Sequence, residues 1–418
     1  MKRKRVGLAI LVILVTLLVA LPSLVGCAKK EEGAERVIKI GVLADFTGVA
    51  GYAMKPTIQA TEDYLAKVLP KTDPLKGVKV EFTHFNTELD YSKTVPGYLE
   101  LKGRGVDMML IPNAQDVELI GDRLAKDSMP VVSSMGLQSK LASEWSLSTV
   151  STVQSQGEAA MLFIKDQWEK DGKSGPIKVG HLGYTLTSTD YYQQGIDLVR
   201  NKYPDKFTWA GLERGMLGNV AWGSEVTRLK SCDYIIVSVA GPMLSSFVSA
   251  ARSGGYTGAF VTGMEGFAGF FGLVRDALKG SPEKLYGCYY VAWWPWWNED
   301  VPFIQECLDY IDTYAAGQAD ALLESSAVIS GLGVGKVLEA GIRTAIKNVG
   351  AENIDGAALK DGLRAIDMEV EGFGDVWKVT PTNNCLSWSQ RAFEWNVTES
   401  QWVPKPTYYV PTLSKPAD

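Results

Sequence analysis

The chain has 418 residues, of which 46% are hydrophobic and 22% charged, so it is long enough to bury a large core and to form two or more domains. It contains only two histidines, His84 and His181, which excludes a His-rich metal site and disfavours a Ser-His-Asp triad, because one of the two would have to act as the base. The net charge of −6 gives little support to broad electrostatic binding of nucleic acid.

The N-terminus has the features of an export signal. Residues 2–5 are all basic, and residues 6–25 contain no charge, which is the order of the basic and apolar regions of a signal peptide. About twenty apolar residues also suffice to span a bilayer, so a retained membrane anchor is the alternative. The sequence Leu24-Val-Gly-Cys27 resembles the lipobox of bacterial lipoproteins, which favours cleavage before Cys27.

We therefore expect a lipoprotein signal peptide over residues 1–26 and a lipidated tether over residues 27–36. The residues after Cys27 are small or charged, as a polar tether requires. A lipidated Cys27 anchors the protein to the cell membrane on its extracytoplasmic side.

From residue 37 onward, short apolar runs alternate with segments of helical periodicity, which is the pattern of an α/β fold. The run Val37–Leu43 predicts a buried strand, and Met54, Ile58 and Leu65 follow at helical spacing. The next predicted elements are a strand at 78–82, a helix at 92–104, a strand at 106–111, a helix at 115–127 and a strand at 130–132. This order predicts a parallel sheet that is covered on both faces.

A second run of the same kind begins near residue 156. Its predicted helices are 157–170, 190–202, 220–230, 243–253 and 268–278, and its predicted strands are 177–182, 207–212, 233–239, 259–262 and 286–292. Two helical stretches at 301–316 and 324–349 follow, and residues 373–404 have the β-branched and aromatic character of strands. We therefore predict two doubly wound parallel-sheet lobes, with a ligand cleft at the carboxyl ends of their strands.

Several local sequences make the chain resemble the type I periplasmic binding proteins, and in particular the leucine/isoleucine/valine-binding proteins of ABC importers. The segment Ile38–Gly48 is similar to the opening strand and loop of that family, and Gly105–Ile111 to the strand before its first ligand loop. Asp190–Gln193 resembles a turn in the second lobe, and Gly263–Gly266 a segment that carries an acidic residue. The resemblance extends over about residues 37–400.

The resemblance implies two lobes that are joined by a multi-strand hinge, because the chain of these proteins returns to each lobe. We expect lobe 1 to comprise residues 37–155 and 289–383. Lobe 2 is then expected to comprise residues 156–288 and 384–418.

The same resemblance implies where a ligand is held. A carboxylate is expected at two loops of lobe 1, and an ammonium group at Glu265 in lobe 2, with tyrosines on the walls of the cleft. The candidate ligand-binding residues are Tyr52, Asn113, Ala114, Gln115, Ser133, Ser134, Met135, Tyr184, Tyr191, Tyr192 and Glu265. Amino-acid binders often carry Ala and Thr where this chain has Met135 and Leu137, so we expect a ligand with a larger or more aromatic side chain than valine.

Each candidate also has a structural interpretation. Asn113 can cap a helix, the tyrosines can pack at a helix start, and Glu265 can be a solvated loop residue. The Trp293–Trp297 segment, with four tryptophans, is an aromatic ligand wall or, alternatively, hinge packing or a partner surface. Gly331–Lys336 lacks the spacing of a phosphate-binding P-loop, so its glycines indicate close helix packing.

Four further cysteines, Cys232, Cys288, Cys307 and Cys385, show no CxxC pair. Outside the cytoplasm they can form one or two disulfides, or remain buried free thiols.

We expect an extracytoplasmic solute-binding lipoprotein of an ABC importer, which closes over a small amino-acid-like, aromatic or apolar ligand and delivers it to a permease. No GxSxG, HExxH or EF-hand motif is present, so we expect no enzymatic activity and no cofactor. Two alternatives are a ligand sensor of the same fold for amides or aromatic acids, and an exported hydrolase with an unrecognised site.

Overall fold

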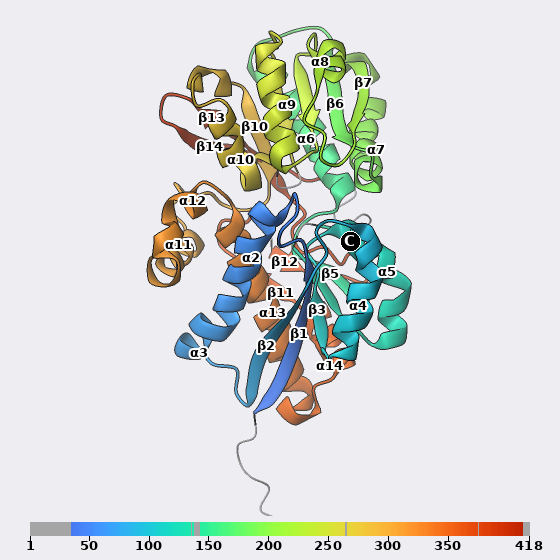
Figure 1. The fold of residues 1–418 in the computed structure, drawn as a ribbon, viewed down its shortest axis with the longest axis vertical. Helices are drawn as coiled ribbons and strands as arrows, with labels where there is room; N and C mark the ends of the chain where they lie inside the picture. Colours follow the sequence, from blue (N-terminus) through green and yellow to red (C-terminus); the bar gives the residue numbers. More distant parts are fainter. Residues whose placement is uncertain (1–34, 135, 138–142, 264–265, 375, 413–418) are drawn as a thin grey trace, which may run out of the picture.

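The computed structural model describes residues 35–412, except 135, 138–142, 264–265 and 375. Its two main sheets form two lobes, which are stacked along the long axis of the molecule with a waist between them (Figure 1). The predicted α/β architecture with two parallel-sheet lobes is therefore confirmed.

Lobe 1 is built on a five-stranded sheet in the order β2-β1-β3-β4-β5, in which all strands run parallel. Ile40 in the interior strand β1 pairs with Phe82 on one side and with Met108 on the other. The strands are β1 (Arg36–Ala44), β2 (Val78–Asn86), β3 (Met108–Leu110), β4 (Val131–Ser133) and β5 (Ser146–Ser148), and the early helices are α2 (Gly51–Asp63), η2 (Tyr64–Val68), α3 (Leu69–Thr72), η3 (Tyr91–Lys93), α4 (Thr94–Gly103) and α5 (Ala114–Asp127).

Alternation along β1 directs its side chains to opposite faces of this sheet. Ile40 and Val42 share a core with Met54 and Ile58 of α2. Leu43 instead belongs to the core formed by residues of α4 and α5. The sheet is therefore covered on both faces, as parallel strands of this apolar composition require.

Late segments of the chain complete lobe 1. Helix α13 (Ala327–Val349) packs lengthwise on α2, and the hydroxyl of Thr61 donates to the carbonyl oxygen of Gly331 at 2.9 Å. A Cβ atom at Gly331 would lie 2.4 Å from the carbonyl oxygen of Thr57, so this glycine permits close packing, as its sequence context indicated. The other late elements are α11 (Pro302–Tyr314), η6 (Ala316–Gln318), α12 (Ala319–Leu323), η7 (Ala351–Asn353), α14 (Gly356–Arg364), β11 (Asp367–Glu369) and β12 (Val376–Lys378).

Lobe 2 is built on a seven-stranded sheet in the order β14-β13-β10-β9-β8-β6-β7. Its first five strands in the chain are parallel, whereas β13 and β14 are antiparallel additions at one edge. The strands are β6 (Ile177–Tyr184), β7 (Phe207–Gly215), β8 (Tyr234–Val237), β9 (Ala259–Thr262), β10 (Cys288–Ala292), β13 (Gln390–Asn396) and β14 (Gln401–Tyr409). The helices are α6 (Val153–Lys170), α7 (Thr187–Lys202), η4 (Pro204–Lys206), α8 (Gly223–Leu229), α9 (Gly241–Ser253), α10 (Gly266–Ala277) and η5 (Pro282–Leu285).

The chain crosses between the lobes three times, at residues 149–152, 293–301 and 379–389. Strand β10 pairs within the sheet of lobe 2, so the second crossing follows Ala292. Residues 289–292, which we expected in lobe 1, thus lie in lobe 2. The other lobe boundaries given above stay predictions. Trp293 and Trp294, at 2% and 1% exposure, are buried in the second crossing, which is the hinge packing considered for this segment.

Polar side chains connect the first two crossings to the start of β13, which directly follows the third crossing. Gln390 donates to the hydroxyl of Ser151 at 2.9 Å. Both carboxylate oxygens of Glu299 accept hydrogen bonds from Arg391, whose side chain is only 9% exposed. A buried and hydrogen-bonded charge pair is costly to break, because either partner alone would be left uncompensated. The three crossings therefore form one connected hinge.

All four cysteines of the body are buried free thiols. Burial raises the pKa of Cys288 to about 12 and that of Cys232 to about 11, so neither is a reactive thiolate at neutral pH.

In the described part of the chain, no single helix is long and apolar enough to cross a membrane. One pair of helical segments, Ala316–Leu323 and Ala327–Val349, passes that test by length and composition, but it is bent by 103°.

Candidate functional site

A cavity of about 80 Å³ lies between the lobes. It is located where the strands of both sheets have their carboxyl ends, which is the place expected for a ligand in open α/β sheets. Its wall is formed by Ala50, Met54, Leu89, Tyr91, Asn113, Ala114, Gln115, Val153, Tyr184, Leu186, Ser188, Leu217, Ser238, Ala240 and Phe270.

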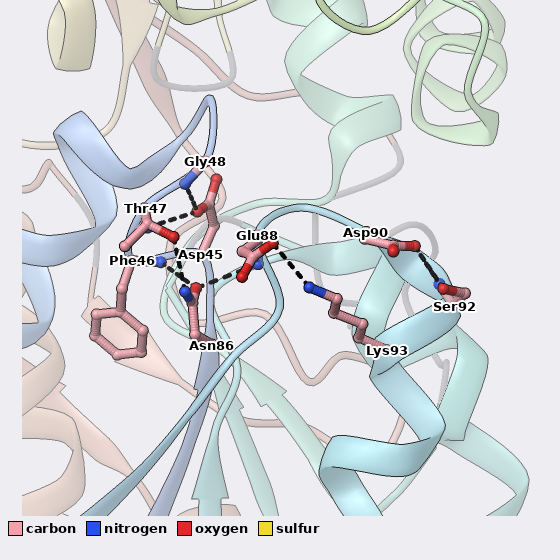
Figure 2. Close-up of polar contacts among 9 residues, drawn as sticks. All are labelled: Asp45, Phe46, Thr47, Gly48, Asn86, Glu88, Asp90, Ser92 and Lys93. Carbon is pink, nitrogen blue, oxygen red and sulfur yellow. Dashed lines mark hydrogen bonds and ion pairs between the residues drawn. The ribbon is translucent and has the colours of Figure 1, made fainter.

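The loop after β1 carries one part of this wall and is held by the buried carboxylate of Asp45. That carboxylate accepts hydrogen bonds from the backbone N–H groups of Thr47 and Gly48 (Figure 2) and from that of Ala50. Three backbone N–H donors thus satisfy the buried carboxylate. The loop that brings Ala50 to the cavity is therefore held in place by hydrogen bonds between its backbone and the side chain of Asp45.

Asn86 at the end of β2 links this loop to the next one. Its side-chain oxygen accepts from the N–H groups of Phe46 (2.9 Å) and Glu88 (3.2 Å), and its amide donates to the hydroxyl of Thr47 (2.7 Å) (Figure 2). Glu88 also forms a 2.8 Å ion pair with Lys93. The two loops thus form one hydrogen-bonded unit.

Glu88 and Leu89 have φ values of 54° and 56°. Two successive non-glycine residues in the left-handed region are strained, and such strain tends to occur at functional sites. Here the turn directs Leu89 and the following Tyr91 into the cavity wall.

Helix α5 begins at the cavity. The side chain of Asn113 accepts from the N–H group of Gln115 at 2.8 Å and caps the helix, while its amide lies 3.3 Å from the hydroxyl of Tyr91. Asn113 thus caps the helix and forms part of the wall, and its ligand role stays a prediction. A helix N-terminus at a cavity provides a favourable place for a negative group.

The wall contributed by lobe 2 follows β6, β7 and β8. The hydroxyl of Tyr184 accepts from the N–H group of Ala240 at 2.7 Å, which connects two of the loops. Burial raises the pKa of Tyr184 to about 12, so the phenol stays neutral. Ser238, directly after β8, lies 2.7 Å from His181.

The lobes contact each other on either side of the cavity. A Cβ atom at Gly241 in lobe 2 would lie 2.9 Å from the carbonyl oxygen of Val49 in lobe 1. The rings of Tyr52 and Phe270 are 5.9 Å apart across the same interface, and Arg275 forms an ion pair with Glu324. These contacts hold the two lobes against each other beside the cavity.

The described residues of the cavity wall carry no charged side chain. Two buried acids, Asp45 and Asp116, lie behind the wall of lobe 1. Asp116 accepts from the hydroxyl of Thr94, and burial raises its pKa to about 6. No group of three His, Cys, Asp or Glu side chains that could hold a metal ion occurs among the described residues.

The structure brings four of the predicted ligand residues together in the cavity wall, namely Asn113, Ala114, Gln115 and Tyr184. Tyr52 lies at the inter-lobe contact and lines a neighbouring groove instead. Met135, Glu265 and the lipidation residue Cys27 lie outside the described residues.

The remaining predicted residues lie away from the cavity. Tyr192 is fully buried in the core of lobe 2, and Tyr191 packs at its edge. The buried hydroxyl of Ser133 lies 3.0 Å and 2.8 Å from the carbonyl oxygens of Pro112 and Gly136, so it supports the second loop. Ser134 is also buried, and its hydroxyl has no partner among the described residues. The ligand role of all these residues stays a prediction.

Sequence reasoning missed most of the apolar wall. Leu186, Leu217 and Ala240 each follow a predicted strand within a few residues, so position after a strand end was the available signal. Met54 and Phe270 instead come from helices that are brought together only by lobe packing. Nothing in their local sequence distinguishes them from core residues.

Sequence comparison agrees with this geometry. Residues 37–397 match the family model described as periplasmic binding protein. The chain belongs to the periplasmic binding protein family. It is a type I member of that family, and the family places it outside the cytoplasm. No curated protein matches the chain in sequence.

Solved structures share the fold of this periplasmic binding protein at low identity. A fatty acid ABC transporter substrate-binding protein from Thermomonospora curvata has a TM-score of 0.76 at 17% identity, covering 91% of this chain and 95% of its own. A branched chain amino acid ABC transporter from Thermus thermophilus with bound valine has a TM-score of 0.77 at 14% identity, covering 91% and 98%. A solute binding protein from R. palustris in complex with benzoate has a TM-score of 0.69 at 13% identity, also covering 91% and 98%.

The raised pKa of Asp116 predicts a stability effect with a defined sign. Its pKa in the folded state, about 6, lies above the ordinary value of 3.8. The charged carboxylate therefore destabilises the folded state above pH 6. This destabilisation disappears as the pH falls from 6 toward 3.8. We expect Asp116→Asn to raise the free energy of unfolding at pH 8 by on the order of 1–2 kcal/mol, and by less at pH 5. Urea denaturation at both pH values measures this difference.

Asp122→Asn is the matched control, because Asp122 is exposed on the same helix α5. It should change the free energy of unfolding little at either pH. A gain for Asp116→Asn that is equal at pH 8 and pH 5 would contradict the assignment of a raised pKa to this carboxyl.

Proposed function

We propose that this protein is a lipoprotein, anchored to the membrane through Cys27, that captures a small apolar or aromatic acid and delivers it to the permease of an ABC importer. In this proposal the helix start at Asn113–Gln115 receives the carboxylate, and Glu265 receives an ammonium group if the ligand is an amino acid. Binding closes the lobes because the closed state makes more ligand contacts than the open one.

The observation that carries the proposal is a cavity lined by residues of both lobes at the carboxyl ends of their strands. Its wall combines a majority of apolar side chains with a few fixed polar groups, which is the composition of small-molecule sites. Leu89, Leu186, Leu217 and Phe270 can contact an apolar ligand body. A ligand held from both sides would link the lobes directly.

The chemistry of the wall supports the ligand class. The described wall residues offer no side-chain cation for a carboxylate, so the proposed partners are backbone N–H groups at the start of α5 other than that of Gln115, which donates to Asn113. The structural neighbours are named for valine, benzoate and fatty acid. These compounds share a carboxylate and an apolar body, which agrees with the wall described here.

A hydrolase deserves consideration only because His181 and Ser238 lie 2.7 Å apart at the cavity. The arrangement is poor for catalysis, since Gln193 rather than a carboxylate contacts the other ring nitrogen, and a neutral amide stabilises an imidazolium less than a carboxylate does. Burial also lowers the pKa of His181 to about 4, which makes it a weak base at neutral pH. The binding role is therefore better supported, and a sensor of the same fold would use the same cavity.

Ligand binding can be tested directly by titrating amino acids, aromatic acids, fatty acids, amides and polyols while recording tryptophan fluorescence and thermal unfolding. We expect saturable stabilisation by one or more apolar carboxylates, because a ligand that binds only the folded state raises its stability. Amides of the same compounds serve as controls for the carboxylate. Stabilisation by polyols alone, or by no compound, would contradict the proposed ligand class.

The proposed role of Glu265 predicts a loss of affinity that is confined to ligands with an amine. Glu265→Gln should weaken binding of an amino acid by about 1.5–3 kcal/mol, the range for a hydrogen bond to a charged group, and should leave binding of the corresponding acid without an amine unchanged. Isothermal titration measures both. Glu283→Gln, at an exposed position of lobe 2, is the control, and equal affinities for Glu265→Gln and wild type would remove Glu265 from the site.

The lipid anchor is tested separately. Cells expressing the full chain should incorporate labelled fatty acid into it and retain it in the membrane fraction, and Cys27→Ser should abolish both. Labelling that persists in Cys27→Ser would place the lipid elsewhere.

A further inference from the structure

A chain of hydrogen bonds runs from the surface of lobe 2 to the ligand cavity. Arg200 forms an ion pair with Asp197 at 2.6 Å, and Asp197 accepts from the side-chain amide of Gln193 at 2.9 Å. The oxygen of the same amide lies 2.8 Å from Nδ1 of His181, and Nε2 of His181 lies 2.7 Å from the hydroxyl of Ser238. Ser238 is part of the cavity wall.

The carboxylate of Asp197 determines which group donates and which accepts in each of these hydrogen bonds. An ionised carboxylate only accepts hydrogen bonds, so the NH₂ group of Gln193 must face Asp197 and its oxygen must face His181. Nδ1 of His181 must then carry the ring proton. In a neutral ring Nε2 is left with a lone pair, which accepts the hydroxyl proton of Ser238.

Other arrangements are disfavoured. The hydroxyl of Ser238 has a second acceptor within reach, the carbonyl oxygen of Leu182, but at 3.4 Å compared with 2.7 Å for His181. A proton on Nε2 of a neutral ring would leave two acceptors, Nδ1 and the oxygen of Gln193, facing each other at 2.8 Å. A charged ring would satisfy both contacts, but His181 is fully buried, and burial disfavours the imidazolium.

We propose that Ser238 is a specificity-determining residue that presents only a hydrogen-bond acceptor to the cavity. His181 and Gln193 are the positioning residues, because they fix the orientation of its hydroxyl group. The site then selects ligands that place an N–H or O–H donor at Ser238, over analogues of the same shape that lack one. This inference rests on the proposed function for the ligand, whereas the proton arrangement stands on the protein alone.

The proton arrangement is tested without any ligand. The full chain with His84→Gln retains one histidine, His181, so its imidazole ¹⁵N and ¹³C NMR signals need no further assignment. We expect a neutral ring protonated at Nδ1 throughout pH 6–8. A neutral ring protonated at Nε2, or an imidazolium at pH 7, would overturn the inference, because Ser238 would then be free to donate.

The selectivity is tested with matched probes: L-phenylalanine against 3-phenylpropanoate, and L-leucine against 4-methylpentanoate. Each pair differs only by the amine donor. Ser238→Ala should reduce the preference for the amine-bearing member by roughly threefold to tenfold, the loss of one hydrogen bond, and Ser238→Thr should restore it. His181→Phe should also reduce this preference, since the hydroxyl is then free to rotate, while 3-phenylpropanoate and 4-methylpentanoate still bind.

An unchanged preference in Ser238→Ala would overturn the role of Ser238 even if every probe binds. If no probe binds to any variant, the proposed function fails instead, and the NMR result alone then decides the proton arrangement. Circular dichroism and thermal unfolding of each variant separate a loss of selectivity from a loss of fold.

Discussion

The hinge is the constraint on which the rest of the molecule depends. The contacts of Ser151 with Gln390 and of Glu299 with Arg391 tie the first two crossings to the start of β13, which directly follows the third crossing. Trp293 and Trp294 of the second crossing are buried. These ties fix the three crossings beside one another at the waist, and the carboxyl ends of strands from both sheets border the same cavity.

The two walls of the cavity are stabilised in different ways. In lobe 1, backbone N–H groups converge on Asp45 and Asn86, and a strained turn at Glu88 and Leu89 directs side chains inward. In lobe 2, hydrogen bonds among side chains connect α7, β6 and β8 and end at Ser238. Preorganised walls of this kind reduce the entropy that a ligand must overcome on binding.

Sequence reasoning predicted most strands and helices, because apolar runs and helical periodicity are local signals. It missed the three-residue strands β5 and β11, which are too short to give such a signal. It also missed the nine-residue helix α14, although Leu359 and Leu363 lie at helical spacing. It also grouped Tyr184 with Tyr192, although Tyr192 shares the buried face of α7 with Ile196 and Val199. Ser238 escaped notice because its significance depends on His181, 57 residues away, and no local pattern reports such a pairing.

The packing of α13 on α2 has a consequence for how the chain reaches its native state. Thr61 and Gly331 are separated by 270 residues yet hydrogen-bonded in one core. Before α13 is present, α2 can pack against β1 through Met54 and Ile58, but the face of α2 that contacts α13 stays uncovered, whereas lobe 2 is largely encoded by one continuous segment. Contacts of this sequence separation slow folding and leave apolar surface exposed in the meantime. Truncation before α13 would therefore leave this surface of lobe 1 exposed.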